Sequence, residues 1–285
     1  MAKENYLSTI EQEFPRMSKT QKVIAMYILE NPMKAAFSTA KELSVAIDAS
    51  PASIIRFAQF VTDGKGYPEL QAEIQKHVQS ITDPMKRLKQ NVVVSDEANT
   101  IFSTIYETQL GNINKTINQN LISSIVKASE LIRNASHIYT TGSRASYASA
   151  YFIGMHLNRI FNNTDIIEVN DRIADYLMRT SEKDVVLFVG LPRNSTRLLK
   201  AAMFLKEKGT PVITITSTPR SPFVPYSDVA LYASCQSNDF HNSQVAVMLV
   251  SELIVSYVIS KSLGKASESL KTIENTFVEM NQFCE

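Results

Sequence analysis

The sequence predicts two domains: an all-α bundle containing a helix-turn-helix, followed by an α/β domain with a five-stranded parallel sheet flanked by helices. Two observations predict this division. Up to about residue 80, apolar residues recur at helical spacing behind capping signals, whereas from residue 137 short β-rich runs alternate with helical stretches. We place the helix-turn-helix domain at 1–80, a linker at 81–98 and the second domain at 99–285, with its core at 120–266.

The helix-turn-helix is predicted from two capping signals close together in the chain. Thr39 and Glu42 form a capping box, so a first helix starts near residue 39. Ser50 is a second N-cap, and Pro51 suits the first position of a helix because its missing N–H would have no partner there. The apolar stripes of the two helices are Ala40, Leu43 and Ile47, then Ile54, Phe57, Ala58 and Val61.

Two further helices complete the predicted bundle. Ser18 and Gln21 form another capping box, which starts a supporting helix that ends at 31–32. The run 63–66 breaks the chain, and a last helix starts at Tyr67 and reaches roughly to residue 80. Residues 81–98 mix proline, charge and a short apolar patch, which is typical of a connector.

The face of the second helix opposite its apolar stripe carries small or hydrogen-bonding side chains, which fit a DNA major groove. We expect Arg56 to read a base and Lys65 to contact phosphate. The alternative is a helical bundle that never meets DNA, because residues 1–80 hold nine basic and nine acidic side chains and so lack a strongly basic footprint. The predicted DNA-binding residues are Ser50, Ala52, Ser53, Arg56, Gln59 and Lys65.

Composition describes an ordinary soluble protein. The chain has 285 residues, 44% hydrophobic content and a formal net charge of +1, which is too neutral for a nucleic-acid coat protein. It has no apolar run of transmembrane length and no signal-peptide core, so we expect a cytoplasmic protein with no membrane partner. Cys235 and Cys284 lack metal-type spacing and are expected to be reduced thiols, with no metal or cofactor.

The second domain begins with helical patterning over 99–134 and then changes period. Helical stretches separate most of the β-rich runs, which predicts a parallel sheet with crossover helices. Such sheets bind ligands at the carboxyl ends of their strands. The predicted strands lie within 137–142, 164–170, 184–190, 211–217 and 228–234.

The first strand ends in a loop that opens into a helix, where hydroxyls and free N–H groups make an anion site. This loop resembles that of the sugar-isomerase (SIS) domain, which has the form Gly-x-Gly-x-Ser. Gly142 and Ser146 match that pattern, while Arg144 stands in place of the second glycine. The loop residues assigned to the site are Thr141, Gly142, Ser143, Arg144 and Ser146.

Three N-terminal segments extend the resemblance to nearly the whole chain: 37–43, 54–57 and 66–70. Together with the SIS loop they resemble the ribose-phosphate-isomerase-repressor (RpiR) type of transcriptional regulator. The resemblance implies binding to double-stranded operator DNA and a C-terminal domain that senses a small anionic metabolite, with a sugar phosphate favoured by the family. It also fits a homo-oligomer, either a dimer or a tetramer.

The loop after the third strand departs from the SIS pattern Ser-x-Ser-Gly-x-Thr. Only Ser195 matches, and Arg193 replaces lost hydroxyls with a side chain that can bind phosphate or carboxylate in a bidentate manner. The alternative is that Arg193 and Arg144 are solvated surface arginines. Asn194, Ser221 and Ser243 complete the predicted site, although turn and cap chemistry explains Ser221 and Ser243 equally well.

The rival class is an enzyme, because SIS domains also occur in sugar-phosphate isomerases, which need a base beside a carbonyl. The candidate bases are Glu168, His156 and His241. None of them lies in a catalytic motif of the family, and a DNA-binding module would be surplus in a metabolic isomerase. We therefore expect a regulator that is not an enzyme.

Overall fold

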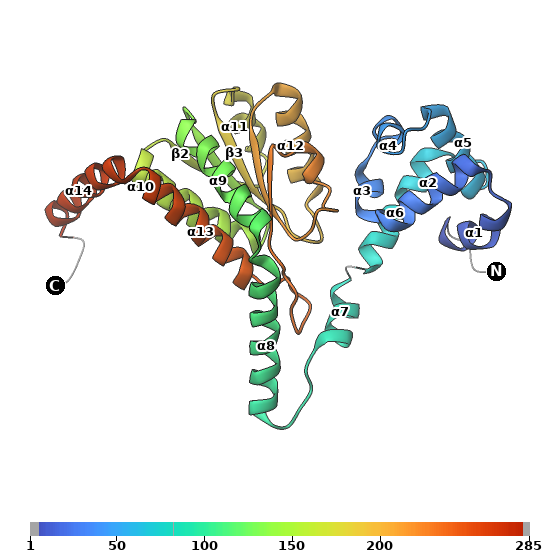
Figure 1. The fold of residues 1–285 in the computed structure, drawn as a ribbon, viewed down its shortest axis with the longest axis horizontal. Helices are drawn as coiled ribbons and strands as arrows, with labels where there is room; N and C mark the ends of the chain where they lie inside the picture. Colours follow the sequence, from blue (N-terminus) through green and yellow to red (C-terminus); the bar gives the residue numbers. More distant parts are fainter. Residues whose placement is uncertain (1–5, 82, 282–285) are drawn as a thin grey trace. The chain divides into compact units, whose positions relative to one another are not determined.

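The computed structural model describes residues 6–81 and 83–281 and divides the chain into two compact units (Figure 1). The helical unit comprises Met1–Arg87 with Arg220–Pro222, and the α/β unit comprises Leu88–Pro219 and Phe223–Glu285. The boundary near residue 87 lies inside the predicted linker. Each unit has its own apolar core.

Short helices build the helical unit around one core. Its largest fully buried side chains include Phe57, Ile28 and Leu43, which come from three different helices. The sequence pattern does not predict helices α1 and α3, of which α3 begins with Pro32 at its first position. The elements are α1 (Tyr6–Glu13), η1 (Phe14–Arg16), α2 (Lys19–Glu30), α3 (Pro32–Phe37), α4 (Ala40–Ala46), α5 (Pro51–Val61) and α6 (Tyr67–Ile81).

Helices α4 and α5 form the predicted helix-turn-helix, with the caps that the sequence indicates. Thr39 accepts from the backbone N–H of Glu42 while the Glu42 carboxylate accepts from that of Thr39, which completes the capping box. Ser50 accepts from the N–H of Ser53 at the start of α5. The predicted stripe of α5 is buried in the core, so the fold presents the opposite face to solvent.

The last helix of this unit satisfies the carbonyls at the end of α3. The Tyr67 hydroxyl and the Gln71 amide both donate to the Ser38 carbonyl, at 2.6 and 2.7 Å. Burial raises the pKa of the Tyr67 hydroxyl well above its usual range, so this group remains a hydrogen-bond donor. These bonds fix α6 on α3 and close the bundle.

The predicted linker contains a helix, α7 (Pro84–Asn91), so it is not simply an irregular connector. Asp83 accepts from the N–H of Met85, and Pro84 occupies the first helical position. This cap and the good helix formers that follow it explain the helix. None of its described side chains is buried, which explains why the segment lacks the pattern of a core element.

The α/β unit contains the predicted sheet of five parallel strands, in the order β2-β1-β3-β4-β5. Each strand lies within the range that the sequence indicates, because buried β-branched runs between turns mark strands of a parallel sheet. The strands are β1 (Ile138–Gly142), β2 (Thr164–Glu168), β3 (Val185–Val189), β4 (Val212–Thr216) and β5 (Val229–Tyr232).

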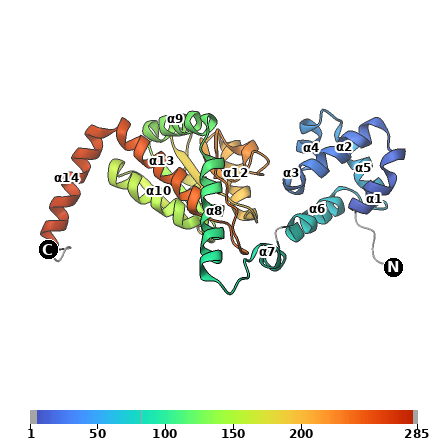
Figure 2. The same cartoon turned by 60° about the horizontal axis from the view of Figure 1, so that its bottom comes forward.

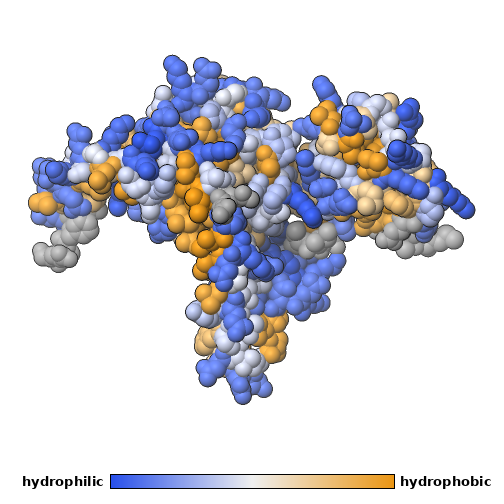
Figure 3. Space-filling view, viewed as in Figure 1, coloured by the Kyte–Doolittle hydropathy of each residue, from blue (hydrophilic) through white to orange (hydrophobic). Residues whose placement is uncertain are grey.

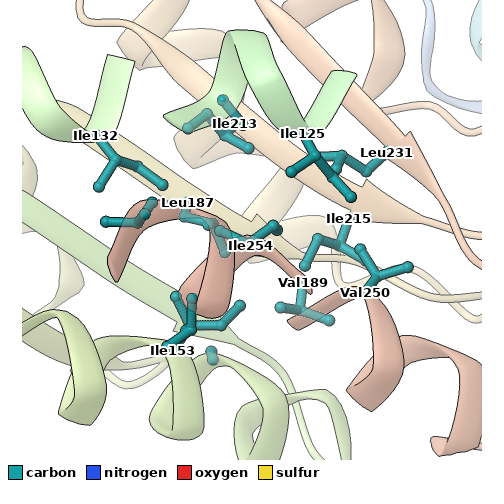
Figure 4. Close-up of a cluster of buried hydrophobic side chains, with 14 of the residues drawn as sticks. Ile125, Ile132, Ile153, Leu187, Val189, Ile213, Ile215, Leu231, Val250 and Ile254 are labelled. Carbon is teal, nitrogen blue, oxygen red and sulfur yellow. The ribbon is translucent and has the colours of Figure 1, made fainter. Parts of the chain in front are cut away.

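Helices cover both faces of this sheet. One face packs on α9, α10 and α13, and Figure 4 shows isoleucines and valines from these helices meeting strand residues such as Leu187 and Ile213. The other face packs on α11 and α12 (Figure 1). The helices are α8 (Ala98–Thr116), α9 (Gln119–Asn134), α10 (Ser146–Phe161), α11 (Ile173–Arg179), α12 (Thr196–Lys208), α13 (Val245–Lys261) and α14 (Leu263–Glu279), with η2 (Val224–Tyr226) before β5.

Helix α14 leaves α13 at a bend of 100° and extends away from the sheet beyond α10 (Figure 2). Among the described residues, no single helix is long and apolar enough to cross a membrane. Helices α13 and α14 taken together have that length and apolar composition, but the chain bends by 100° between them. Cys235 is buried, whereas Cys284 lies outside the described residues.

Candidate functional site

The exposed face of α5 carries the side chains predicted to read DNA. Ala52, Arg56 and Gln59 are exposed, and Ser53 is half-buried. Ile55 and Phe60 are also exposed on this helix, at 43% and 41%. These two apolar side chains were not predicted, and they are of the kind that contacts a thymine methyl group in the major groove.

Hydrogen bonds organise the first turn of α5. The hydroxyls of Ser50 and Ser53 lie 2.9 Å apart, and Arg56 donates to the Ser53 hydroxyl at 3.4 Å. The guanidinium is therefore oriented along the exposed face of the helix by a weak bond that a base can replace. Lys65, just beyond α5, is half-exposed and forms an ion pair with Glu69 at 3.8 Å, which solvent screens.

The second candidate site lies at the carboxyl edge of the sheet, between β1 and β3. With the strand order 2-1-3-4-5, the crossover connections leave these two strands in opposite directions, which is where open parallel sheets form a ligand crevice. The loops after β1 and β3 lead into α10 and α12 on opposite faces of the sheet. The sheet topology thus brings Arg144 and Arg193 to the same crevice.

The loop after β1 is shaped by close packing at its glycine. A Cβ on Gly142 would lie 2.6 Å from the carbonyl oxygen of Ser146, so only glycine lets α10 begin this close to the strand. The N–H groups of Ser146, Tyr147 and Ala148 donate to carbonyls of 143–145. These three amides are therefore engaged in tight turns, contrary to the expectation that the helix start presents free N–H groups.

Arg144 and Arg193 each adopt a left-handed backbone conformation, with φ of 56° and 63°. Such conformations are strained for arginine and concentrate at functional loops. The Arg144 guanidinium donates to the Arg193 carbonyl at 2.7 Å, and Asn242 donates to the carbonyl of Pro192 at 2.9 Å. Side chains from two neighbouring loops thus hold consecutive carbonyls of the loop after β3.

These bonds give the two arginines different tasks. Arg144 is exposed but its guanidinium is directed at the protein backbone, so part of its donor capacity supports the loop. Arg193 is exposed at the entrance to α12. Ser195 is the N-cap of α12 and accepts from the N–H of Leu198 at 3.4 Å, which leaves its hydroxyl proton available for an anion.

Asn194 of this loop and Gln244 before α13 carry buried amide oxygens. Within the described part of the chain, Oδ1 of Asn194 and Oε1 of Gln244 are buried without a hydrogen-bond partner. Gln244 follows Asn242, which is bonded to the loop after β3, and it precedes α13. Unsatisfied buried amides cost free energy unless a bound group pairs with them. Asn194 was predicted as a site residue, whereas no pattern in the sequence marks Gln244.

Several predicted site residues have other tasks in the structure. The Thr141 hydroxyl donates to the Ile167 carbonyl inside the sheet. The buried Ser243 hydroxyl donates to the side-chain oxygen of Gln109 in α8 and accepts from the N–H of Val245, the first residue of α13. Ser221 is buried in the loop that follows β4. Ser143 is half-buried in the loop after β1.

The three candidate bases do not share a site. Glu168 ends β2, His156 lies in the middle of α10 against the ring of Phe152, and His241 pairs with Asp239 after β5. Burial and the nearby Arg159 lower the pKa of His156. Catalysis of proton transfer needs a base and an acid around one substrate, and these positions do not provide that arrangement.

Family models match both units of the chain. Residues 4–81 match the helix-turn-helix domain of the rpiR family, and residues 131–257 match the SIS domain. The second match begins in α9 and ends in α13, and so it covers the whole sheet. The first covers the helical bundle up to the end of α6.

Relatives that match over nearly their whole length are named HTH-type transcriptional regulators. The chain is 25% identical over 274 residues to an uncharacterized HTH-type transcriptional regulator of Caldanaerobacter subterraneus, covering 95% of both chains. It is 21% identical over 282 residues to the HTH-type transcriptional regulator HexR of Escherichia coli, covering 96% of this chain and 95% of HexR. The fold is similar to that of Vibrio vulnificus NanR complexed with ManNAc-6P, with a TM-score of 0.63, 19% identity and coverage of 99% and 100%.

Proposed function

This chain belongs to the RpiR-type helix-turn-helix transcriptional regulators with a SIS domain, and we propose that its α/β unit senses a small anionic metabolite, in the first place a sugar phosphate. The chain is a DNA-binding regulator, with the helix-turn-helix on α4 and α5. Its named relatives are transcriptional regulators, and we propose that it is not an enzyme. Its operator DNA would place it in the cytoplasm.

One observation carries the ligand proposal: Arg193 is held at the switch point of the sheet by the bond from Arg144 to its carbonyl. A guanidinium in that position pairs with phosphate or carboxylate, and the Ser195 hydroxyl at the start of α12 binds the same group. Ser146, at the start of α10, lies on the other side of this crevice. The buried oxygens of Asn194 and Gln244 accept from hydroxyls, which a sugar phosphate supplies and inorganic phosphate at neutral pH supplies poorly.

For the DNA-binding side we propose that Arg56 reads a base edge while Ser50, Ser53 and Gln59 contact base edges or phosphates beside it, with Ala52 allowing close approach. Lys65 contacts phosphate. One helical unit presents one recognition helix, so a two-fold homodimer matches the two half-sites of a palindromic operator. A tetramer would pair two such dimers.

The test uses the full-length chain and an operator fragment selected from random DNA. Fluorescence anisotropy measures DNA affinity while phosphorylated sugars, the unphosphorylated sugars and carboxylates are added in turn. A sugar phosphate added near its wild-type Kd is expected to change operator affinity in the wild type and to have little effect in Arg193→Ala, whose ligand-free affinity stays intact. A response of Arg193→Ala at wild-type ligand concentrations contradicts the proposed site.

A further inference from the structure

Helix α8 presents an apolar stripe to solvent. Phe102 is 68% exposed, Tyr106 65%, Leu110 40% and Ile117 52%. Their spacing of four, four and seven residues places them on one side of the helix. The opposite flank of α8 is anchored to the rest of the unit through Asn112, which bonds to the backbone at Gln236.

The stripe continues onto α13, which lies against α8. Val245 and Leu253 of α13 are 43% and 37% exposed, and Figure 3 shows hydrophobic atoms that follow α13 and continue onto α8. The bond between Ser243 and Gln109 holds the two helices together at this junction. A connected apolar surface of this kind on a soluble domain marks a protein interface.

A hollow of about 270 Å³ lies beside the stripe. Ile101, Ile105 and Gln109 of α8 form one wall, and Val92, Val93 and residues 237–239 and 241 form the rest. This volume is below the range of about 300–1,000 Å³ typical of ligand pockets and suits a single large side chain. The Asn238 side chain lines the hollow, and its buried Oδ1 has no hydrogen-bond partner among the described residues. An aromatic side chain with a hydroxyl would satisfy it.

We propose that the α8–α13 surface binds a second copy of this chain, and that Tyr106 of each copy fills the hollow of the other and donates its hydroxyl to Asn238. This inference rests on the dimer in the proposed function and names the surface that forms it. Tyr106 and the Ile105 wall of the hollow both belong to α8, and a two-fold contact places the same surface of each copy against the other. Each copy therefore offers both halves of the contact.

The exposed area also suits a second copy. An aromatic side chain of the size of Phe102 or Tyr106 buries about 150–250 Å². Together with Ile105, Leu110, Ile117, Val245 and Leu253, which are all more than one-third exposed, the surface approaches the roughly 800 Å² per partner of a standard interface. Since α8 directly follows the linker, pairing here also joins the two DNA-binding modules by a short covalent path.

Sedimentation equilibrium of the full-length chain tests this interface. The wild type is expected to be a dimer, and Phe102→Glu/Tyr106→Glu is expected to raise the dimer Kd by at least about 100-fold, because the new charges would be buried in an apolar interface. Met178→Glu is the matched control, since Met178 of α11 is 73% exposed on another face of the unit. It is expected to remain a dimer. Circular dichroism and melting temperature confirm that each variant folds.

The possible outcomes test the α8–α13 surface and the existence of a dimer separately. A wild-type dimer that survives the double substitution overturns the α8–α13 surface but leaves the proposed regulator intact, and dissociation by Leu270→Glu/Val278→Glu would then assign the interface to α14. A wild type that stays monomeric overturns both the surface and the dimer, whatever sugar phosphates do to DNA affinity. Tyr106→Phe, which removes only the hydroxyl, is expected to weaken the dimer about 10-fold.

Chemical cross-linking keeps the proposal testable if the glutamate variants fail to fold. Leu110→Cys in a Cys284→Ser background places a thiol in the middle of the stripe. A short bis-maleimide is expected to produce a covalent dimer of this variant at low protein concentration. Met178→Cys in the same background is expected to remain monomeric on a denaturing gel. Equal cross-linking of the two variants contradicts the proposal.

Discussion

Arg144 and Arg193 are both exposed, and each follows a central strand with its backbone in the left-handed conformation. The surroundings of their side chains differ. The Arg144 guanidinium reaches across to the Arg193 carbonyl, so it stabilises the conformation that presents Arg193. We therefore propose Arg144 as a positioning residue and Arg193 as the ligand residue. Neither assignment follows from residue type, because the loops meet only when β1 and β3 pair in the sheet.

A double-mutant cycle tests this division. We expect Arg193→Ala to weaken sugar-phosphate binding by about 1.5–3 kcal/mol, the value of a charge-assisted hydrogen bond, and Arg144→Ala to weaken it less. Because Arg144 acts through Arg193, the effect of Arg144→Ala should largely disappear in the Arg193→Ala background. Isothermal titration calorimetry measures all four variants. Additive losses would mean that both arginines contact the ligand.

Substitution of Arg56 tests whether this side chain reads a base in the DNA. Arg56→Ala is expected to weaken binding to the specific operator by about 1–3 kcal/mol and to affect random DNA much less, because base contacts specify sequence. Lys65→Ala is expected to weaken all sequences alike and to reduce the salt dependence of binding. Electrophoretic mobility shifts on both DNAs provide the comparison. Equal losses on the two DNAs for Arg56→Ala would show that Arg56 does not read a base.

At the scale of elements, α10 is the best example of a helix whose position depends on glycine. Gly142 lets the helix begin next to the end of β1, and Gly154 lets its middle lie against the sheet. A Cβ on Gly154 would lie 2.3 Å from Oγ1 of Thr140 and 2.6 Å from Cγ1 of Ile166. The distance of α10 from β1 and β2 therefore depends on the absence of a side chain at Gly142 and Gly154.

Two glycine-to-alanine substitutions in helices should have opposite effects. Gly154→Ala is expected to destabilise the α/β unit by about 1–3 kcal/mol, because the added methyl overlaps buried atoms. Gly111→Ala in α8 meets no atom within 4 Å and is expected to stabilise by roughly 0.5–1 kcal/mol through helix propensity. Urea unfolding followed by circular dichroism measures both. A stabilising Gly154→Ala would mean that α10 moves away from the sheet without penalty.

At the scale of the whole molecule, each unit contains a histidine whose charged form is disfavoured by burial. Burial and Lys86 lower the pKa of His77 in the helical unit, and burial and Arg159 lower that of His156 in the α/β unit, where Glu252 partly opposes the shift. The folded chain therefore binds fewer protons than the unfolded chain around the ordinary histidine pKa of about 6.5. Protonation at lower pH consequently favours unfolding of both units.

We expect the melting temperature to fall as the pH drops from 7 to 5, since the stabilisation from neutral histidines is present above their unfolded pKa and is lost below it. His77→Gln/His156→Gln should reduce this dependence on pH, because glutamine does not titrate. Differential scanning calorimetry at several pH values measures the slope for both proteins. A double variant with the wild-type slope would assign the pH dependence to other groups.

The sequence alone determined which segments become helices and strands where the signal is local. Capping boxes at Thr39 and Ser18, the Ser50–Pro51 start of α5 and the five β-rich runs predicted elements that the structure contains, because caps and periodic burial act over a few residues. The Asp83–Pro84 cap of α7 is equally local, but none of the described side chains of α7 is buried, so no apolar pattern marks that helix.

Only the tertiary structure decided the order of the strands and the contacts that follow from it. Pairing of β1 with β3 joins Arg144 to Arg193 across 49 residues, and the Ser243 hydroxyl bonds to Gln109 of α8 across 134 residues. The buried oxygen of Gln244 and the hollow beside Tyr106 likewise arise from segments far apart in the chain. Such contacts depend on how separate elements pack, and no repeating pattern along the sequence records that packing.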